Sequence, residues 1–225
     1  MLQKDAVMSL QDLSKKHSPE GASLRKTRFT RMMIQVNNLN PANFESWAFC
    51  QGMLFGSPDK WWGDNGLRDF PHEGIDFCLY SDRSGQIRRL NEQTRIPVMH
   101  DGLVQAMFTD YLGQAIVIEH EYGHHQNGKF LSVYAHTSPQ DGIRPGVTVN
   151  EGDIIATIAD TKHSKAKILP HLHFSLGLPS PALCYDPFVW GIMRDADRIT
   201  LLNPFDAIDW HCRKLDSGDS GCLGL

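Results

Sequence analysis

Several features that would assign a chain to a functional class at once are absent from this 225-residue sequence. No apolar stretch approaches the roughly 20 residues needed to span a bilayer. The N-terminus, MLQKDAVMSLQDLSKKHSPE, lacks the uninterrupted apolar segment of a secretory signal. Lys and Arg form no run beyond a short basic patch between Ser23 and Arg31, and the formal net charge is −4. We therefore expect no membrane span and no nucleic-acid surface.

Cysteine pairs of the kind that bind zinc are also absent. The five cysteines contain no CxxC pair, which argues against a thiolate zinc site. Cys212 and Cys222 could close a C-terminal loop in an oxidising compartment, although buried, inert thiols are the favoured interpretation. The full set is Cys50, Cys78, Cys184, Cys212 and Cys222.

Two short motifs supply histidine and aspartate instead. His72 and Asp76 lie in FPHEGIDF, and His171 and His173 lie in LPHLHFSL. Two neutral imidazoles and one carboxylate, with a fourth position left to water, form a ligand set that a catalytic Zn²⁺ site uses. In an extended strand, residues i and i+2 project from the same face, so His171 and His173 can point into one cleft while their apolar neighbours face a core. The chain contains no HExxH, so it has no helix-borne glutamate base of the thermolysin kind.

A third histidine lies in the run KFLSVYAH. Strand alternation places Phe130, Ser132, Tyr134 and His136 on one face of this run. His136 could therefore meet the other site residues without being a ligand itself.

Together these motifs resemble the lysostaphin-type (LytM-type) zinc endopeptidases, which cleave peptides of bacterial peptidoglycan. A His-x-Gly-x-Asp element, a Tyr-Ala-His strand and a Pro-His-x-His-Phe strand occur in that family's order over residues 66–176. The resemblance implies that His72, Asp76 and His173 bind Zn²⁺ and that His171 and His136 assist catalysis without binding it. It also implies a peptidoglycan peptide as substrate and a periplasmic or extracellular location.

The chain departs from that family just before the Pro-His-x-His strand, where TKHSKAKIL replaces a shorter, glycine-rich turn. This loop, residues 161–169, contains His163 and three lysines, Lys162, Lys165 and Lys167. It borders the expected substrate groove and could attract a substrate carboxylate. A solvated loop without a substrate role is an equal alternative.

The pattern along the chain predicts a mainly β fold. From residue 95 to residue 176, short apolar runs alternate with turn signals, which favours an antiparallel β sandwich or barrel. The resemblance implies the duplicated hybrid motif type, and the pair Asn127-Gly128 indicates a hairpin. Residues 1–36 suit one or two helices, or a helix and a strand, broken at HSPEG. Residues 37–65 are expected to wrap irregularly, with their tryptophans packing on the core rather than lining a groove.

We expect three parts along the chain. An N-terminal helical or irregular segment, 1–64, packs on the core. A metallopeptidase domain, 65–210, has its core at 66–176 and an insertion at 177–200. A flexible tail follows at 211–225.

Three functions compete for this sequence. The first is an active zinc endopeptidase, and the second is a binding or regulatory member of the same fold without turnover, against which the intact five-residue set argues. The third is a lipoyl- or biotinyl-type carrier domain, similar in the run GVTVNEGDIIATIAD but without a Met-Lys or Asp-Lys modification turn.

Five other histidines are expected to be surface or hydrogen-bonded residues rather than ligands: His100, His120, His124, His125 and His163.

Overall fold

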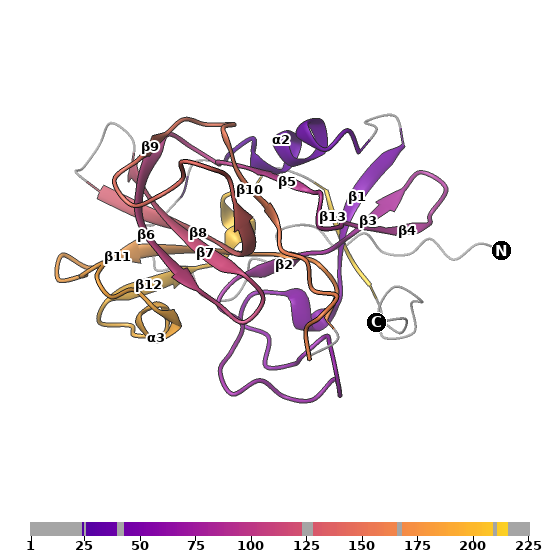
Figure 1. Ribbon diagram of the computed structural model, residues 1–225. Helices are drawn as coiled ribbons and strands as arrows, with labels where there is room; N and C mark the ends of the chain where they lie inside the picture. The colour runs from indigo at the N-terminus through magenta and orange to yellow at the C-terminus, as the bar shows by residue number, and fades with distance from the viewer. Residues whose placement is uncertain are drawn as a thin grey trace.

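The computed structural model describes residues 24, 26–39, 43–122, 128–165, 168–208 and 211–215 (Figure 1). The helices are α2 (Phe29–Val36) and α3 (Trp190–Met193), with 3₁₀ turns η1 (Gln51–Met53) and η2 (Pro204–Asp206). The strands are β1 (Phe44–Phe49), β2 (Ile75–Phe77), β3 (Leu79–Asp82), β4 (Ile87–Arg89), β5 (Arg95–Pro97), β6 (Gly102–Thr109), β7 (Gln114–Tyr122), β8 (Gly128–Pro139), β9 (Thr148–Val149), β10 (Ile154–Ile158), β11 (Leu172–Pro179), β12 (Ile199–Leu202) and β13 (Cys212–Lys214). In these ranges, no helix has the length and apolar character that a bilayer crossing requires.

The strands form two sheets. The smaller sheet has the order β13-β1-β3-β4, and its β1–β13 pair is parallel. In the described ranges the larger sheet has nine strands, with the main path β12-β11-β8-β7-β6-β9. Strand β2 joins it beside β11, and β10 pairs with both β8 and β5. All pairs of the larger sheet are antiparallel, so the predicted mainly β, antiparallel core is confirmed.

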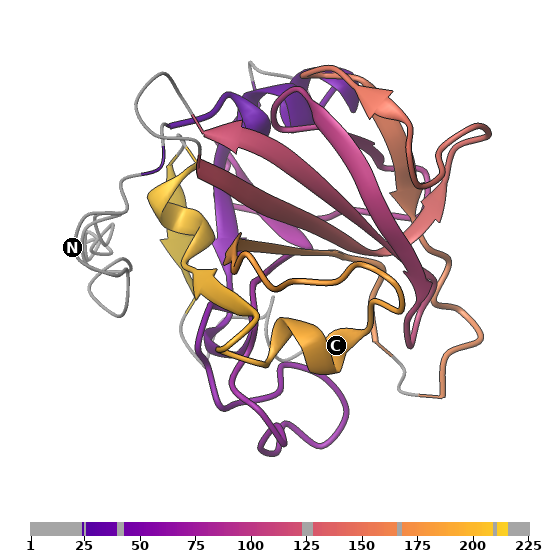
Figure 2. The ribbon, with the colours of Figure 1, turned by 90° about the vertical axis from the view of Figure 1, so that its left-hand side faces the viewer.

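Both faces of the larger sheet are covered. Leu172, Phe174 and Leu176 of β11 pack in the main core, as strand alternation predicts. The opposite face carries a second apolar cluster that includes Val117 and Val133, together with buried residues of the segment between β11 and β12. Because both faces are buried, the run QAIVIEH in β7 is apolar without strict alternation. Figure 2 shows α2 and α3 on opposite sides of the long strands.

The predicted hairpin is present between β7 and β8. These strands pair antiparallel from Gln114 to Tyr122, and Tyr122 lies opposite Gly128. Asn127, the first residue of the predicted turn, lies outside the described residues.

The N-terminal part supplies a helix that supports the strand carrying the histidine pair. Phe29 of α2 is fully buried. Its ring stacks on Phe174 of β11 at a centroid distance of 4.7 Å and meets Phe77 of β2 edge-on at 5.9 Å. Phe29 therefore packs on the core side of the two strands that carry the predicted ligands. The earlier helical stretch expected before HSPEG lies outside the described residues.

Residues 37–65 are more regular than expected. They contain β1, which pairs with β3 on one side and β13 on the other. The expectation of an irregular wrap is therefore wrong for Phe44–Phe49. The run FESWAF is almost entirely buried, and pairing on both edges satisfies its backbone groups.

The predicted insertion and tail both contribute strands to the sheets. Ile199–Leu202 forms β12, which pairs with the end of β11, and α3 lies between these strands. Cys212–Lys214 forms β13, so the first residues of the predicted tail join a sheet. The remaining residues of that tail, 216–225, lie outside the described residues.

The cysteines differ from one another in state. Cys50 is disulfide-bonded, whereas Cys78, Cys184 and Cys212 form no disulfide. The alternative bridge between Cys212 and Cys222 is therefore not formed. Burial raises the pKa of the Cys212 thiol to about 12, which makes it an unreactive thiol.

Candidate active site

The pairing of β2 with β11 brings the two predicted motifs together. His173 lies directly opposite Asp76 in this antiparallel pair. Paired residues project from the same face of a sheet, so the two side chains meet on the side away from the main core. His72 joins them from the loop before β2, where its backbone N–H donates to Ser57 O at 3.0 Å.

Gly74 allows this close approach. A Cβ atom at Gly74 would lie 2.2 Å from Phe174 O and 2.6 Å from Ser175 Oγ. Any other residue at this position would push β2 away from β11. The glycine of the His-x-Gly-x-Asp element is thus required by packing rather than by an unusual backbone angle.

Three possible ligand atoms converge at this point: His72 Nε2, Asp76 Oδ1 and His173 Nδ1. They lie 2.9 to 3.1 Å from one another, and all three residues are buried. Atoms bound tetrahedrally at about 2.0–2.1 Å from one Zn²⁺ are roughly 3.3 Å apart, close to the observed spacing. Across the described ranges, no second group of His, Cys, Asp or Glu side chains converges in this way.

Hydrogen bonds on the far sides of the two imidazoles determine which nitrogens face this group. His72 Nδ1 donates to Leu54 O at 3.1 Å, so its Nε2 presents a lone pair. His173 Nε2 lies 2.7 Å from the Ser175 hydroxyl, which can accept its proton and leave Nδ1 as a lone pair. Two lone pairs and a carboxylate oxygen repel one another unless a cation lies between them. The donor set therefore fits a divalent metal.

The charge states of Asp76 and His72 also suit metal binding. Burial raises the pKa of the Asp76 carboxyl, but the facing His72 and His171 hold that pKa well below its usual range. Burial lowers the pKa of His72, so its imidazole is neutral at neutral pH. An ionised carboxylate beside neutral imidazoles is the state in which these groups can act as ligands.

His171 lies beside the three converging atoms. Its Nδ1 carries the ring proton and donates to Leu169 O at 2.8 Å. Its Nε2 therefore has no proton, and it lies 4.0 Å from Asp76 Oδ1. Burial lowers the pKa of His171 to about 3, so the ring is neutral over the ordinary pH range. A neutral imidazole in this place can accept a proton from a group bound next to Asp76.

His136 reaches the same site through an irregularity in β8. The pairing of β7 with β8 shifts register between Gln114 and Ile116, so that Ala135 and His136 stand opposite a single residue. This is a β-bulge. At its second residue, His136, φ is 62°, which lies in the left-handed region that non-glycine residues seldom adopt.

The bulge overturns one prediction from strand alternation. Alternation places His136 on the same face as Tyr134, and this is wrong. The Tyr134 ring lies 5.3 Å from Phe174 in the main core, whereas the His136 ring lies 4.8 Å from His171 on the other side of the sheet. The extra residue shifts the alternation by one position and carries His136 into the cleft.

Asp110 holds His136 in this conformation. Its Oδ2 accepts the His136 backbone N–H at 2.7 Å and lies 3.1 Å from His136 Nδ1. Its Oδ1 accepts the backbone N–H groups of Leu112 and Gly113. Burial raises the pKa of Asp110, but the contacts with His136 and these N–H groups hold it well below its usual range. An ionised carboxylate thus fixes both the β6–β7 turn and the strained histidine.

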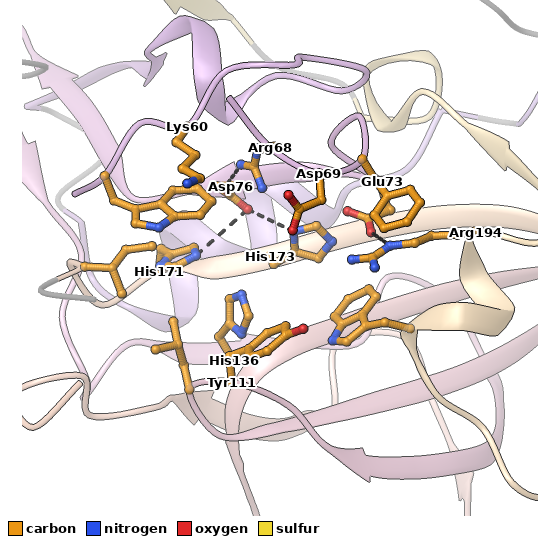
Figure 3. A pocket seen from close by; sticks show the side chains of 15 residues that line it. Lys60, Arg68, Asp69, Glu73, Asp76, Tyr111, His136, His171, His173 and Arg194 are labelled. Carbon is orange, nitrogen blue, oxygen red and sulfur yellow. Dashed lines mark hydrogen bonds and ion pairs between the residues drawn. The ribbon is translucent and has the colours of Figure 1, made fainter. Parts of the chain in front are cut away.

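Asp76, His136, His171 and His173 line a cleft of about 420 Å³. Figure 3 shows His171 and His173 between Asp76 on one side and His136 and Tyr111 on the other. Aromatic side chains form much of the wall, and two of them are open to solvent: Tyr111 is 84% exposed and Phe70 is 53% exposed. Exposed aromatic residues around a concave polar site are typical of a ligand-binding surface.

The sequence of this region matches a known family. Residues 71–180 match the model described as Peptidase family M23. The matched segment belongs to this family. It contains all five predicted site residues, and the match confirms the predicted resemblance to this peptidase family. We refer to residues 71–180 as the M23 domain.

Solved structures of similar proteins share limited identity with the chain. The structure of LytU is 25% identical over 56% of this chain and 70% of that chain, with a TM-score of 0.38. The solution structure of lysostaphin is 20% identical over 71% of this chain and 49% of that chain, with a TM-score of 0.40. A putative glycyl-glycine endopeptidase lytM from Ruminococcus gnavus is 16% identical over 62% of this chain and 50% of that chain, with a TM-score of 0.38. The chain thus spans about half the length of the last two, and no curated protein matches it.

The motifs of the M23 domain do not predict Trp61 and Arg68, two side chains that hold Asp76. Trp61 Nε1 donates to Asp76 Oδ2 at 2.6 Å, and Arg68 Nη2 lies 3.5 Å from the same oxygen. Trp61 is buried, as packing predicts, but its polar edge contacts the site. The only signal in the sequence is a tryptophan expected to be buried, since a buried indole N–H usually finds an acceptor. Asp110, which anchors His136, has no sequence signal of its own. Trp62 packs on the core and also lines the cleft, so the expectation that the tryptophans do not line a groove is wrong for Trp62.

The segment between β11 and β12 forms another wall of the cleft. Arg194 Nε bonds to the Glu73 carboxylate, and its guanidinium lies 4.5 Å from the centre of the Phe70 ring. The Trp190 ring meets His173 edge-on at 5.1 Å. The predicted insertion therefore contributes directly to the site.

The lysine-rich loop, residues 161–169, lies largely outside the cleft. Lys162 Nζ pairs with Glu92 at 2.8 Å, and Thr161 Oγ1 donates to Ile168 O at 2.7 Å. Of the loop residues described near this cleft, only Ile168 lines it. Residues 166 and 167 lie outside the described residues, so Lys167 is not placed. The contacts of Lys162 favour the alternative of a surface loop for that lysine.

His120 belongs to the structure rather than to the site. Its Nδ1 donates to Asp101 O at 2.9 Å and its Nε2 lies 2.6 Å from Ser132 Oγ. It is buried and stacks on Phe130. This agrees with the expectation of a hydrogen-bonded histidine. His124 and His125 lie outside the described residues.

Proposed function

We propose that the M23 domain is a zinc-dependent endopeptidase that hydrolyses peptide bonds in peptidoglycan stem or cross-bridge peptides. The convergence of His72 Nε2, Asp76 Oδ1 and His173 Nδ1 is the observation that supports this most directly. These atoms would hold the ion, as three protein ligands do in open catalytic zinc sites. When bound, Zn²⁺ supplies Lewis acidity that polarises a carbonyl oxygen and lowers the pKa of a water ligand.

The two remaining histidines provide proton transfer in this proposal. His171 is the general base, because burial keeps its ring neutral and its Nε2 lies 4.0 Å from Asp76 Oδ1. His136 lies across the cleft from Asp76 and faces Asp110 with Nδ1. As an imidazolium it can donate a hydrogen bond from Nε2 to the oxyanion that develops on the scissile carbonyl. Asp110 holds the His136 ring, so little reorganisation is needed during the reaction.

The substrate and location follow from the family and from the cleft. A cavity of about 420 Å³ is in the range of small-ligand sites and accepts a few residues of a peptide. A peptidoglycan substrate would place the protein in the periplasm or outside the cell. The disulfide-bonded Cys50 suits such an oxidising compartment.

The test combines metal content with cleavage. Purified peptidoglycan is incubated with the protein, with and without a chelator, and the released peptides are identified by mass spectrometry. We expect peptides with new amino termini that disappear on chelation. Asp76→Ala and His173→Ala should lose both metal and cleavage, whereas His100→Ala, outside the cleft, should keep both. Full zinc occupancy in both ligand variants would refute the metal assignment, and zinc binding without cleavage of any wall peptide would indicate a non-catalytic member of the family.

A further inference from the structure

The two oxygens of the Asp76 carboxylate have different partners. Oδ1 faces His72 and His173, the other two proposed ligands. Oδ2 accepts the indole N–H of Trp61 at 2.6 Å, which is a short hydrogen bond. A carboxylate held in this way turns one oxygen toward the metal position and keeps the other away from it.

The same tryptophan contacts the proposed general base. The rings of Trp61 and His171 meet edge-to-face, with centroids 4.9 Å apart and an interplanar angle of 84°. Trp61 is 3% exposed, so its ring is fixed by packing on all sides. One side chain therefore restrains both a proposed ligand and a proposed catalytic group.

The backbone around Trp61 is itself held tightly. A Cβ atom at Gly52 would lie 2.8 Å from the backbone nitrogen of Trp61, so only glycine permits this contact. Arg68 crosses the same region, donating to Gly52 O at 2.9 Å and to Asp59 O at 3.0 Å. Its Nη2 also lies 3.5 Å from Asp76 Oδ2. The indole N–H thus reaches Asp76 from a rigid support.

We infer that Trp61 is a positioning residue for the metal site, which fixes Asp76 for one-oxygen ligation and holds the ring of His171 beside it. This inference rests on the proposed zinc function. Trp61 does not line the cleft and acts only through these two residues. Partners that hydrogen-bond to metal ligands typically change metal affinity by 10- to 100-fold when they are removed.

The test is the zinc affinity of Trp61→Phe, measured by competition with a chromophoric chelator. This variant keeps an aromatic ring but removes the N–H, and we expect the dissociation constant for zinc to rise by about 10- to 100-fold. Trp47→Phe is the matched control. Trp47 is fully buried, and its indole nitrogen has no hydrogen-bond acceptor among the described residues. Trp47→Phe should lower thermal stability while leaving zinc affinity within about twofold of the unsubstituted protein.

A second replacement separates the hydrogen bond from packing. Site-specific exchange of the Trp61 indole for benzothiophene keeps the shape of the side chain and removes only the N–H. It should weaken zinc binding as Trp61→Phe does and alter the visible absorption of the Co²⁺-loaded protein, which reports ligand geometry. Unchanged affinity and an unchanged Co²⁺ spectrum in the benzothiophene protein would refute the positioning role. Failure of the unsubstituted protein to bind zinc would instead remove the proposed function, and this inference with it.

Discussion

His173 lies directly opposite Asp76 in the pairing of β2 with β11, and their Nδ1 and Oδ1 atoms are 3.0 Å apart. The hydrogen bonds of the sheet therefore hold two proposed ligands in contact before any ion binds. His72 completes the group from a loop whose position depends on β2. The proposed metal site should consequently be sensitive to anything that changes the distance between these two strands.

Gly74→Ala tests this dependence. Its Cβ atom would lie 2.2 Å from Phe174 O, so β2 must move or the backbone must distort. We expect a loss of about 1–3 kcal/mol in the free energy of unfolding, together with a large loss of zinc affinity. Gly191→Ala is a suitable control, because the nearest atom to its Cβ would be 3.9 Å away. Denaturant titration and chelator competition give the two quantities, and normal zinc affinity in Gly74→Ala would contradict the argument.

Replacing the two histidines that are proposed not to bind the metal should separate metal binding from catalysis. His171→Ala and His136→Ala should keep most of the zinc but lose about 10²-fold or more in the rate of peptide cleavage, the scale of one acid–base group. Metal analysis and a peptide-cleavage assay on the same preparations measure both. If either variant loses zinc as completely as His173→Ala does, that histidine is a ligand and its role is misassigned.

Asp110→Asn should disturb His136 without removing it. The Asp110 carboxylate accepts three backbone N–H groups through its two oxygens, so an amide in either orientation places its NH₂ against a donor. A mismatch of this kind costs about 1–3 kcal/mol. We expect lower stability and a cleavage rate reduced by about 10- to 10²-fold, with zinc affinity retained. Asp141→Asn, on an exposed turn, serves as the control, and an unchanged rate in Asp110→Asn would show that this carboxylate does not position His136.

His120 should contribute to a loss of stability in acid. Burial lowers the pKa of His120 to about 4, whereas histidine in an unfolded chain titrates near 6.5. Between these values the unfolded chain binds a proton that the folded protein does not, so the free energy of unfolding decreases as the pH falls. The contribution is at most about 3 kcal/mol.

The measurement is a comparison of pH dependence between variants. His120→Gln should reduce the difference in free energy of unfolding between pH 7 and pH 4.5, while His163→Gln, at an exposed position, should leave it unchanged. An equal pH dependence in His120→Gln and the unsubstituted protein would show that His120 makes no contribution.

Much of the fold and the identity of the proposed ligands could be predicted from local sequence. Alternating apolar residues indicated the strand at β11, and the same alternation placed His171 and His173 on one face, because side-chain direction in a strand repeats every two residues. The motifs resembling a known family named Asp76 and His72 as well. These inferences needed only neighbouring residues, which is why they could be made without a structure.

Tertiary structure decided the features that depend on distant partners. Alternation placed His136 on the wrong face of β8. A bulge arises from the pairing of two strands, and the sequence of neither strand alone shows where it occurs. The contacts of Trp61 with Asp76 and of Asp110 with His136 join segments 15 and 26 residues apart along the chain. The sequence around a buried tryptophan or aspartate looks the same whether or not its side chain supports a site. Local sequence determines which face of a strand a side chain occupies, whereas the register between strands and the packing of loops determine which other side chains it meets there.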